Sequence, residues 1–271
     1  MKKILFLISV FFYAAAVFSQ DKNANFSVAL ETSSYTYSEP SLGVKLSGPK
    51  YGISAEYLAR NAQKGGLFAA AQLGFMTGNV DYNGYVENIA TRVVTPHSVG
   101  GIKDYYFEGR FLLGFAAADS GSASSFWPYL GIGYRRLFNG MGVDAYGYDR
   151  TSTYIYLPAG VRARFKMPRG WELSPSAEYN IFLGGTQESA LPGETIIKNQ
   201  DEGYGLRASI RVSKNLGRAA FFLEPFYRYW NISQSDWVYS YYLSSVAGTP
   251  MYASEPANNT TEFGLKIGAS F

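Results

Sequence analysis

The sequence predicts an all-β fold, an antiparallel transmembrane β-barrel of about ten strands, from three observations. The last stretch of the chain alternates apolar and polar residues with the period of a β-strand. The first stretch has the layout of an export signal. Between them no apolar run is long enough to cross a bilayer as a helix, although aromatic residues make up 17% of the chain.

The carboxyl-terminal strand is predicted over residues 258–271. Every second residue from Thr261 onward is apolar, namely Phe263, Leu265, Ile267, Ala269 and Phe271. A free strand at a chain end frays, whereas a closed barrel pairs its last strand with its first. The stretch resembles the last strand of bacterial outer-membrane β-barrels, although Ala269 replaces the bulkier residue common there. The resemblance implies an assembly signal, read by the barrel-assembly machinery, made of Phe263, Leu265, Ile267 and Phe271.

The amino terminus reads as a secretory signal peptide over residues 1–19. Lys2 and Lys3 precede an apolar run over 4–18, and a small residue, Ser19, follows it. We expect cleavage after Ser19, with cleavage after Ala16 as the alternative. The run is shorter than the roughly 20 apolar residues of a permanent membrane helix. The mature barrel domain is then 20–271.

The composition of the mature chain excludes several classes of protein. After removal of Lys2 and Lys3, 22 basic and 21 acidic residues remain, a net charge of +1. A chain this close to neutral has no electrostatic footprint for nucleic acid. The chain has no cysteine, so disulfides and a lipid anchor are excluded.

Ten strands are expected in chain order. They span 26–37, 50–60, 67–80, 104–118, 126–138, 152–167, 171–185, 203–214, 219–234 and 258–271. Short connections rich in turn residues alternate strictly with long ones near 38–49, 81–103, 139–151, 186–202 and 235–257. This alternation is typical of outer-membrane barrels, which have short periplasmic turns and longer extracellular loops. Eight or twelve strands remain alternatives, because 38–49 could hold a further short strand.

The charged residues of these strands share one face, opposite the apolar one. An Arg or Lys facing lipid near the bilayer midplane costs about 2–4 kcal/mol, so this face must line the lumen. Only Arg136 falls on the apolar face, at a strand end. The charged lumen residues are Glu31, Glu56, Arg60, Glu108, Arg110, Arg135, Arg162, Arg164, Lys166, Glu172, Glu178, Arg207, Arg211, Glu224, Arg228, Glu262 and Lys266. A soluble barrel would show the reverse arrangement.

The predicted lumen holds seven acidic and ten basic residues. Interior charges need partners or solvent, and a barrel of ten strands has little room for water. We therefore expect a salt-bridged, largely occluded lumen. Arg162 and Arg164 are expected to face Glu172 and Glu178, and Arg207 and Arg211 to lie beside Glu224 and Arg228. The alternative is a narrow, porin-like passage with a mild preference for anions.

Enzymatic function rests on the single histidine, His97, which precedes Ser98 in the expected loop 81–103. Adjacent loop residues seldom point at each other. The ten-stranded omptin proteases use paired aspartates and an Asp–His couple, and here no Asp precedes His97. We therefore expect an exposed loop histidine and no enzymatic activity, with an outer-membrane hydrolase as the third function considered. One histidine and no cysteine give no metal-ligand spacing, so no metal or cofactor is expected.

The expected outward loops are rich in aromatic residues. In the last one, the candidates for contact with an extracellular protein or glycan are Trp237, Tyr239, Tyr241 and Tyr242. The same rings could instead extend the barrel wall or sit in the interfacial aromatic belt. The sequence thus predicts a barrel of the bacterial outer membrane, surrounded by lipid as a monomer, with a structural or surface-interaction role.

Overall fold

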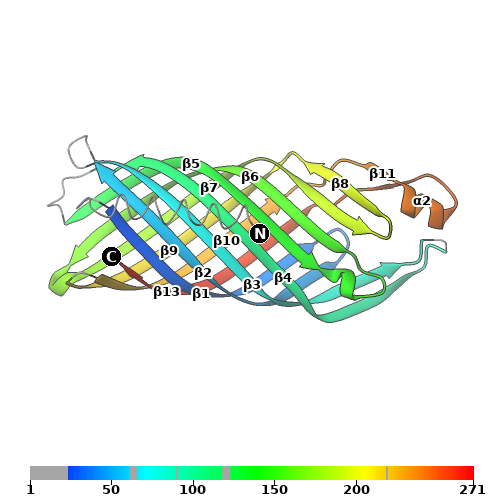
Figure 1. The fold of residues 1–271 in the computed structure, drawn as a ribbon, viewed down its shortest axis with the longest axis horizontal. Helices are drawn as coiled ribbons and strands as arrows, with labels where there is room; N and C mark the ends of the chain where they lie inside the picture. The colour runs from blue at the N-terminus through cyan, green and yellow to red at the C-terminus, as the bar shows by residue number, and fades with distance from the viewer. Residues whose placement is uncertain (1–23, 62–65, 90, 118–122, 218) are drawn as a thin grey trace.

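The computed structural model describes residues 24–61, 66–89, 91–117, 123–217 and 219–271. Within these residues, ten antiparallel strands close into one barrel (Figure 1). The expected signal peptide, residues 1–19, lies outside the described residues. The ten barrel strands are β1 (Ala24–Glu39), β2 (Val44–Asn61), β3 (Leu67–Glu87), β4 (Val94–Phe115), β5 (Ser124–Gly140), β6 (Asp149–Met167), β7 (Trp171–Leu191), β9 (Gly203–Leu216), β10 (Ala219–Ile232) and β13 (Asn258–Ser270).

The barrel is a meander in which each barrel strand pairs with the barrel strands before and after it in the chain. The pairing of β1 with β13 closes the ring. At this closure, Phe26 N donates to Phe271 O at 3.1 Å and Phe271 N donates to Phe26 O at 2.8 Å. The final residue is therefore hydrogen-bonded to the first strand, as the alternating carboxyl-terminal pattern predicts. The expected ten-stranded closed barrel is confirmed.

Alternation along the strands separates an apolar exterior from a mixed interior. In β1, Val28 and Leu30 are 41% and 69% exposed, whereas Glu31 and Tyr35 are buried in the lumen. The same pattern exposes Ile53, Phe75, Phe107, Phe111, Leu130, Ile132, Ile155, Ile181, Ile210, Phe221, Phe263 and Ile267. A closed barrel satisfies its backbone polar groups internally, so this apolar belt suits a hydrocarbon surrounding.

Among the described residues, no helix is long and apolar enough to cross a membrane.

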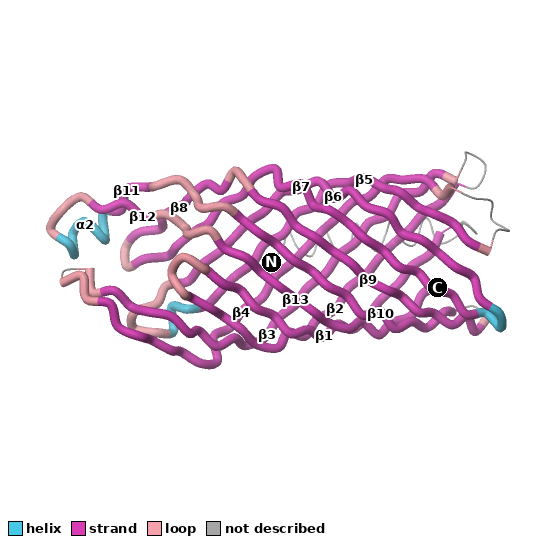
Figure 2. The backbone as a smooth tube through the Cα atoms, turned by 180° about the vertical axis from the view of Figure 1, so that it is seen from behind, coloured by secondary structure: helices cyan, strands magenta, loops and turns pink. Residues whose placement is uncertain are grey.

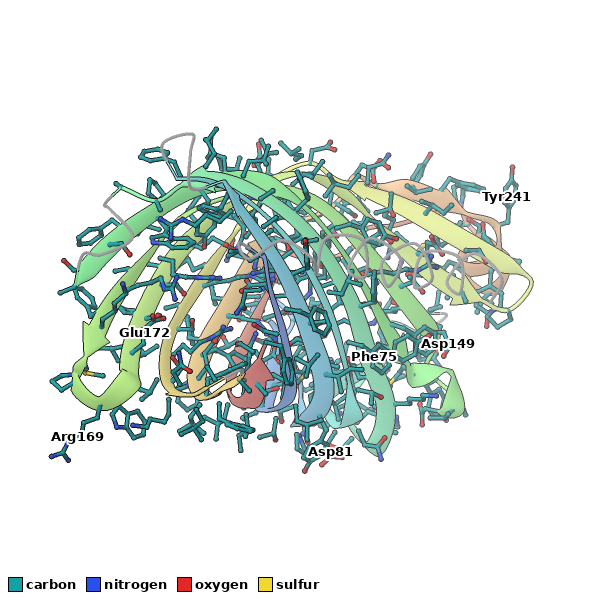
Figure 3. The ribbon with its side chains drawn as sticks, turned by 60° about the vertical axis from the view of Figure 1, so that its left-hand side comes forward. Phe75, Asp81, Asp149, Arg169, Glu172 and Tyr241 are labelled. Carbon is teal, nitrogen blue, oxygen red and sulfur yellow. The ribbon has the colours of Figure 1, made fainter. Side chains whose placement is uncertain are left out.

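The two ends of the barrel differ, and Figure 3 shows Arg169 at one and Tyr241 at the other. The first, here called the turn end, carries the 3₁₀ turn η2 (Pro168–Gly170) and the paired residues Phe26 and Phe271. The second, here called the hairpin end, carries β8 (Glu194–Gln200), β11 (Val238–Ser240), α2 (Tyr241–Ala247) and β12 (Met251–Ala253) (Figure 2). The short turn η1 (Met141–Val143) also lies between strands at this end.

The connections at the hairpin end are more ordered than the sequence predicts. The expected loop 81–103 is mostly strand, because β3 continues to Glu87 and β4 begins at Val94. The expected loop 38–49 shrinks to the turn between Glu39 and Val44. Beyond the apolar belt neither face of a strand contacts lipid, so the alternation disappears while the ladder of hydrogen bonds continues.

The lumen is not lined by polar groups alone. Three buried apolar clusters lie in the described part of the molecule, and one of them brings together Tyr154, Tyr156, Phe182, Trp230 and Ile232. These side chains come from three strands, β6, β7 and β10, and pack together inside the barrel. Aromatic rings therefore fill part of the space that the sequence assigns to charges.

Candidate functional site

Four large side chains pack together inside the barrel and are here called the plug: Tyr106, Arg135, Tyr156 and Trp230. Each is at most 2% exposed. The guanidinium of Arg135 lies 3.9 Å from the centre of the Tyr106 ring and 6.0 Å from that of Trp230, a cation–π arrangement. The rings of Tyr156 and Trp230 meet edge to face at 4.9 Å.

Two glycines make room for the plug. A Cβ atom at Gly133 would lie 2.2 Å from Tyr156 Cζ, and one at Gly205 would lie 2.9 Å from Trp230 Cε3. These contacts are too close for any other residue without movement of a ring. The glycines of β5 and β9 thus define where the aromatic side chains of β6 and β10 lie.

Charged residues form hydrogen bonds with the two tyrosines of the plug. Tyr106 Oη donates to Glu262 Oε2 at 2.8 Å and accepts from Arg228 Nη1 at 2.7 Å. The other nitrogen of Arg228, Nη2, donates to Glu31 Oε2 at 2.8 Å. On the opposite side, Tyr156 Oη donates to Glu108 Oε1 at 2.6 Å. The buried hydroxyl groups therefore have the partners that burial requires.

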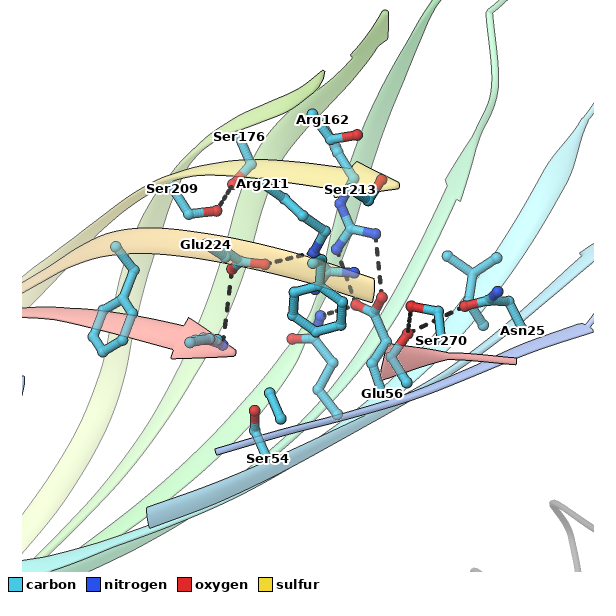
Figure 4. A pocket seen from close by; sticks show the side chains of 18 of the residues that line it. Asn25, Ser54, Glu56, Arg162, Ser176, Ser209, Arg211, Ser213, Glu224 and Ser270 are labelled. Carbon is cyan, nitrogen blue, oxygen red and sulfur yellow. Dashed lines mark hydrogen bonds and ion pairs between the residues drawn. The ribbon is translucent and has the colours of Figure 1, made fainter. Parts of the chain in front are cut away.

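Between the plug and the turn end lies a cavity of about 550 Å³, here called the cup (Figure 4). Its walls carry most of the lumen charges expected from the sequence, joined in ion pairs. Arg162 Nη2 lies 2.9 Å from Glu56 Oε2, Arg211 Nε lies 2.6 Å from Glu224 Oε2, and Lys266 Nζ lies 3.1 Å from Glu31 Oε1. Arg110 pairs with Glu178, and Arg207 pairs with Glu108.

The structure forms some of the expected pairs and replaces others. Arg164 faces Glu172, with Nη2 and Oε2 2.8 Å apart, and Arg211 lies beside Glu224. Arg162 instead reaches across the lumen to Glu56 of β2, and Glu178 takes Arg110 of β4. Pairing across the lumen is not visible in a strand pattern, which orders only neighbouring strands.

A second closed network lies between the plug and the hairpin end, among residues that the sequence placed outside the lumen. Arg150 Nη1 lies 2.9 Å from Glu39 Oε1 and 3.6 Å from Glu255 Oε1, and Lys198 Nζ lies 3.2 Å from Glu255 Oε2. Tyr37 Oη lies within hydrogen-bonding distance of both carboxylates, 2.8 Å from Glu39 Oε1 and 3.0 Å from Glu255 Oε1, and its one proton can be donated to either. Between this network and the plug, a fully buried Lys50 pairs with Asp104. Lys50 and Asp104 alternate with outward apolar residues along their strands. This alternation is the sequence signal that could have placed both side chains in the lumen.

The expectation that His97 lies in an exposed loop is wrong. It belongs to β4, where it pairs with Gly84 of β3, and its side chain is 23% exposed. Its Nε2 lies 3.0 Å from Asp144 Oδ2, and its ring is edge to face with Tyr146 at 5.7 Å. Ser98 points elsewhere and donates to Asn83 Oδ1 at 3.0 Å, because successive strand residues face opposite sides. The His–Asp couple joins positions 47 residues apart, beyond the reach of a local motif.

The last hairpin at this end forms a rigid aromatic platform, here defined as Tyr239, Tyr241 and Tyr252. Their rings meet edge to face, with Tyr239 centred 5.0 Å from Tyr241 and 5.6 Å from Tyr252. Tyr241 is 75% exposed, and Trp237 beside the platform is 64% exposed. Tyr242 is only half-buried.

Glu194 of β8 forms hydrogen bonds with the segment that carries the platform. Its carboxylate accepts hydrogen bonds from Ser240 Oγ at 2.7 Å and from the backbone N–H groups of Tyr241 and Tyr242 at 3.1 and 3.0 Å. These bonds, that of Ser240 first, lower the pKa of Glu194 below its usual range. A carboxylate at the start of α2 thus holds the helix and the aromatic rings on it in one orientation.

The assembly-signal residues lie on the outer face of β13. Phe263, Ile267 and Phe271 are exposed and Leu265 is half-buried. In the part of the chain that the structure describes, no group of three or more His, Asp or Glu side chains is placed to bind a metal ion.

Comparison with known proteins concerns the fold. No protein-family model and no curated protein matches the sequence. Among solved structures, the outer membrane protease OmpT from Escherichia coli is similar at a TM-score of 0.57 and 12% identity, over 92% of this chain and 96% of that chain. The translocator domain of the autotransporter NalP from Neisseria meningitidis has a TM-score of 0.44 at 10% identity, over 100% and 97% of the two chains. A major outer membrane protein from Thermus thermophilus has a TM-score of 0.39 at 12% identity, over 92% and 99%.

The likeness to OmpT shows a shared fold and nothing of activity. Together with the closed ring of ten strands and the apolar belt, it shows that the chain has the fold of bacterial outer-membrane β-barrels.

Proposed function

We propose that this protein is an outer-membrane barrel with an occluded lumen and no enzymatic activity, whose hairpin end serves a surface-interaction role. The observation that supports occlusion most strongly is the plug, in which four large side chains pack across the lumen and are almost fully buried. The network of Arg150, Glu255 and Lys198 provides a second closure in series with it. An open channel through the barrel would require the contacts of both the plug and this network to separate.

The proposed orientation puts the turn end in the periplasm and the hairpin end outside the cell. Short periplasmic turns and long extracellular hairpins are the rule for such barrels. The barrel-assembly machinery would then act on the outer face of β13 during biogenesis, and lipid would surround a monomer. The aromatic platform and Trp237 are the surface offered to an extracellular protein or glycan, because rigid, exposed Tyr and Trp rings give contact area at low entropic cost.

Planar-bilayer conductance of the refolded mature chain, residues 20–271, tests the occlusion. A heat-modifiable, folded barrel that gives no current steps supports the proposal. Defined steps would instead favour the narrow, porin-like channel for small polar or anionic solutes.

The surface role is tested by display on bacterial cells. Cells carrying the wild-type barrel should bind components of protein and glycan arrays that cells carrying Trp237→Ala/Tyr241→Ala do not bind. The matched control is Val143→Ala/Tyr146→Ala, which removes two exposed apolar side chains from a different hairpin. Equal binding by all three strains would rule out the platform as the contact surface.

A hydrolase is the third candidate function, after the channel, and one observation favours it: the contact of His97 with Asp144 at the hairpin end of a fold similar to that of an outer membrane protease. Against it, the neighbouring hydroxyl of Ser98 is bonded to Asn83. His97→Ala should leave the wild-type phenotype unchanged if the barrel is not an enzyme. Loss of peptide or ester cleavage in that variant, with cleavage present in the wild type, would favour the hydrolase.

A further inference from the structure

We propose that the cup is a binding site for a small organic anion carrying carboxylate or phosphate groups, which enters from the turn end. The plug closes the cup toward the other end of the barrel, so the site is a dead end. Its volume of about 550 Å³ lies within the range of about 300–1,000 Å³ that is usual for small-molecule sites.

The charge of the cup favours an anion. Its walls hold eight basic and six acidic side chains, a surplus of two positive charges. Each of the six carboxylates already has a basic partner, such as Arg162 for Glu56 and Arg211 for Glu224. The surplus is therefore basic, and a cleft with low-dielectric walls concentrates its field on a ligand of opposite sign.

Neutral hydrogen-bond donors complement this charge. Seven serines line the cup, two of them joined as Ser176 and Ser209 with their oxygens 2.9 Å apart (Figure 4). Deeper in the wall, Arg110 Nε is buried and has no hydrogen-bond partner among the described residues. Hydroxyl and guanidinium N–H groups are the donors that carboxylate and phosphate oxygens accept from. The rings of Phe222 and Phe226 also line the cup and add apolar surface to its wall.

The mouth of the cup lies at Arg164 and Lys166, whose side chains are less buried than those deeper in the wall. They are the first charges that a ligand entering from the turn end meets. Substitution here changes the charge of the cup at its mouth, and it breaks the pair of Arg164 with Glu172, which is more exposed than the pairs deeper in the wall.

Isothermal titration of the refolded mature chain in non-ionic detergent tests the site, with glucose 6-phosphate, inorganic phosphate and glucose as probes. We expect saturable binding of glucose 6-phosphate that weakens as salt is raised, because ions screen the field of the cup. Binding of inorganic phosphate with the same salt dependence also supports the site. Glucose that binds as tightly as glucose 6-phosphate would overturn the proposal.

The variant Arg164→Gln/Lys166→Gln removes the surplus charge and should weaken glucose 6-phosphate binding by roughly tenfold or more. The control Arg136→Gln/Arg169→Gln removes two charges that do not line the cup and should bind like the wild type. An equal loss in both variants, or no saturable heat from a wild-type barrel of proven fold, refutes the site. The salt dependence needs no substitution, so a misfolded variant does not leave the proposal undecided. Conductance is a separate readout, so a failed cup leaves the proposed occlusion standing.

Discussion

Gly133 illustrates how one residue positions the plug. The Tyr156 ring opposite it is fixed at both ends, by the hydrogen bond to Glu108 and by the contact with Trp230, so it has little freedom to move. Gly133→Ala places a Cβ 2.2 Å from that ring. Overpacking of this kind costs about 1–3 kcal/mol, and the free energy of unfolding in detergent should fall by that amount in urea titrations.

Gly74 provides the matched control, because a Cβ there meets no heavy atom within 4 Å. Gly74→Ala should leave the unfolding free energy unchanged or slightly raised, since alanine has less conformational entropy to lose than glycine. If both variants unfold at the same urea concentration as the wild type, the plug is looser than the contacts of Tyr156 indicate.

For single residues, the alternation along a strand predicts whether a side chain faces the lumen or the exterior. It does not predict which other side chain it contacts. Glu56 and Arg162 are both assigned to the lumen by alternation, yet their contact joins β2 and β6 across the barrel. Lys50 and Asp104 stand at the first positions of predicted strands, and their alternation with outward residues could place both inside but does not say that they pair with each other. Partner choice inside a barrel depends on its diameter and on side-chain length, which the sequence of one strand does not contain.

At the scale of the element, the ionised carboxylate of Glu194 stabilises the hairpin that carries α2. Hydrogen bonds from Ser240 Oγ and the Tyr242 N–H lower its folded pKa below the ordinary value of 4.5. The resulting stabilisation is complete above the unfolded pKa and is lost as the pH falls through the folded one. Hydrogen exchange of amides 241–247, corrected for its intrinsic pH dependence, should therefore accelerate under strong acid.

Substitution of Glu194 separates this effect from general acid unfolding. Glu194→Gln should give fast exchange in this segment already at neutral pH and remove its pH dependence. Glu202→Gln, which neutralises an exposed acid in the connection between β8 and β9, should behave like the wild type. Slow exchange in Glu194→Gln at neutral pH would mean that the helix does not depend on this carboxylate.

The elements that the sequence predicts are those with an alternating apolar face. All ten barrel strands have such a face, and the alternation reveals each of them. The outer halves of β3 and β4 and the whole of β8 lack a regular alternation of apolar and polar residues. Their order comes from pairing with neighbouring strands, a tertiary effect that leaves no periodic trace.

At the scale of the whole molecule, the two ends of the barrel differ, and the plug and the network of Arg150, Glu255 and Lys198 lie between them. This asymmetry leads to a prediction about the orientation of the barrel in the membrane. The cup opens at the turn end, and the aromatic platform lies at the other. The chain has no cysteine, so single substitutions report accessibility without background. A polyethylene glycol maleimide too large for porins should label Tyr241→Cys in intact bacterial cells. It should label Ser213→Cys, in the wall of the cup, only after the outer membrane is disrupted. Labelling of Ser213→Cys alone in intact cells would mean that the barrel is inserted in the opposite orientation. Labelling of both would mean that the reagent crosses the outer membrane of these cells, whereas protection of Ser213→Cys beside a labelled Tyr241→Cys supports the proposed orientation.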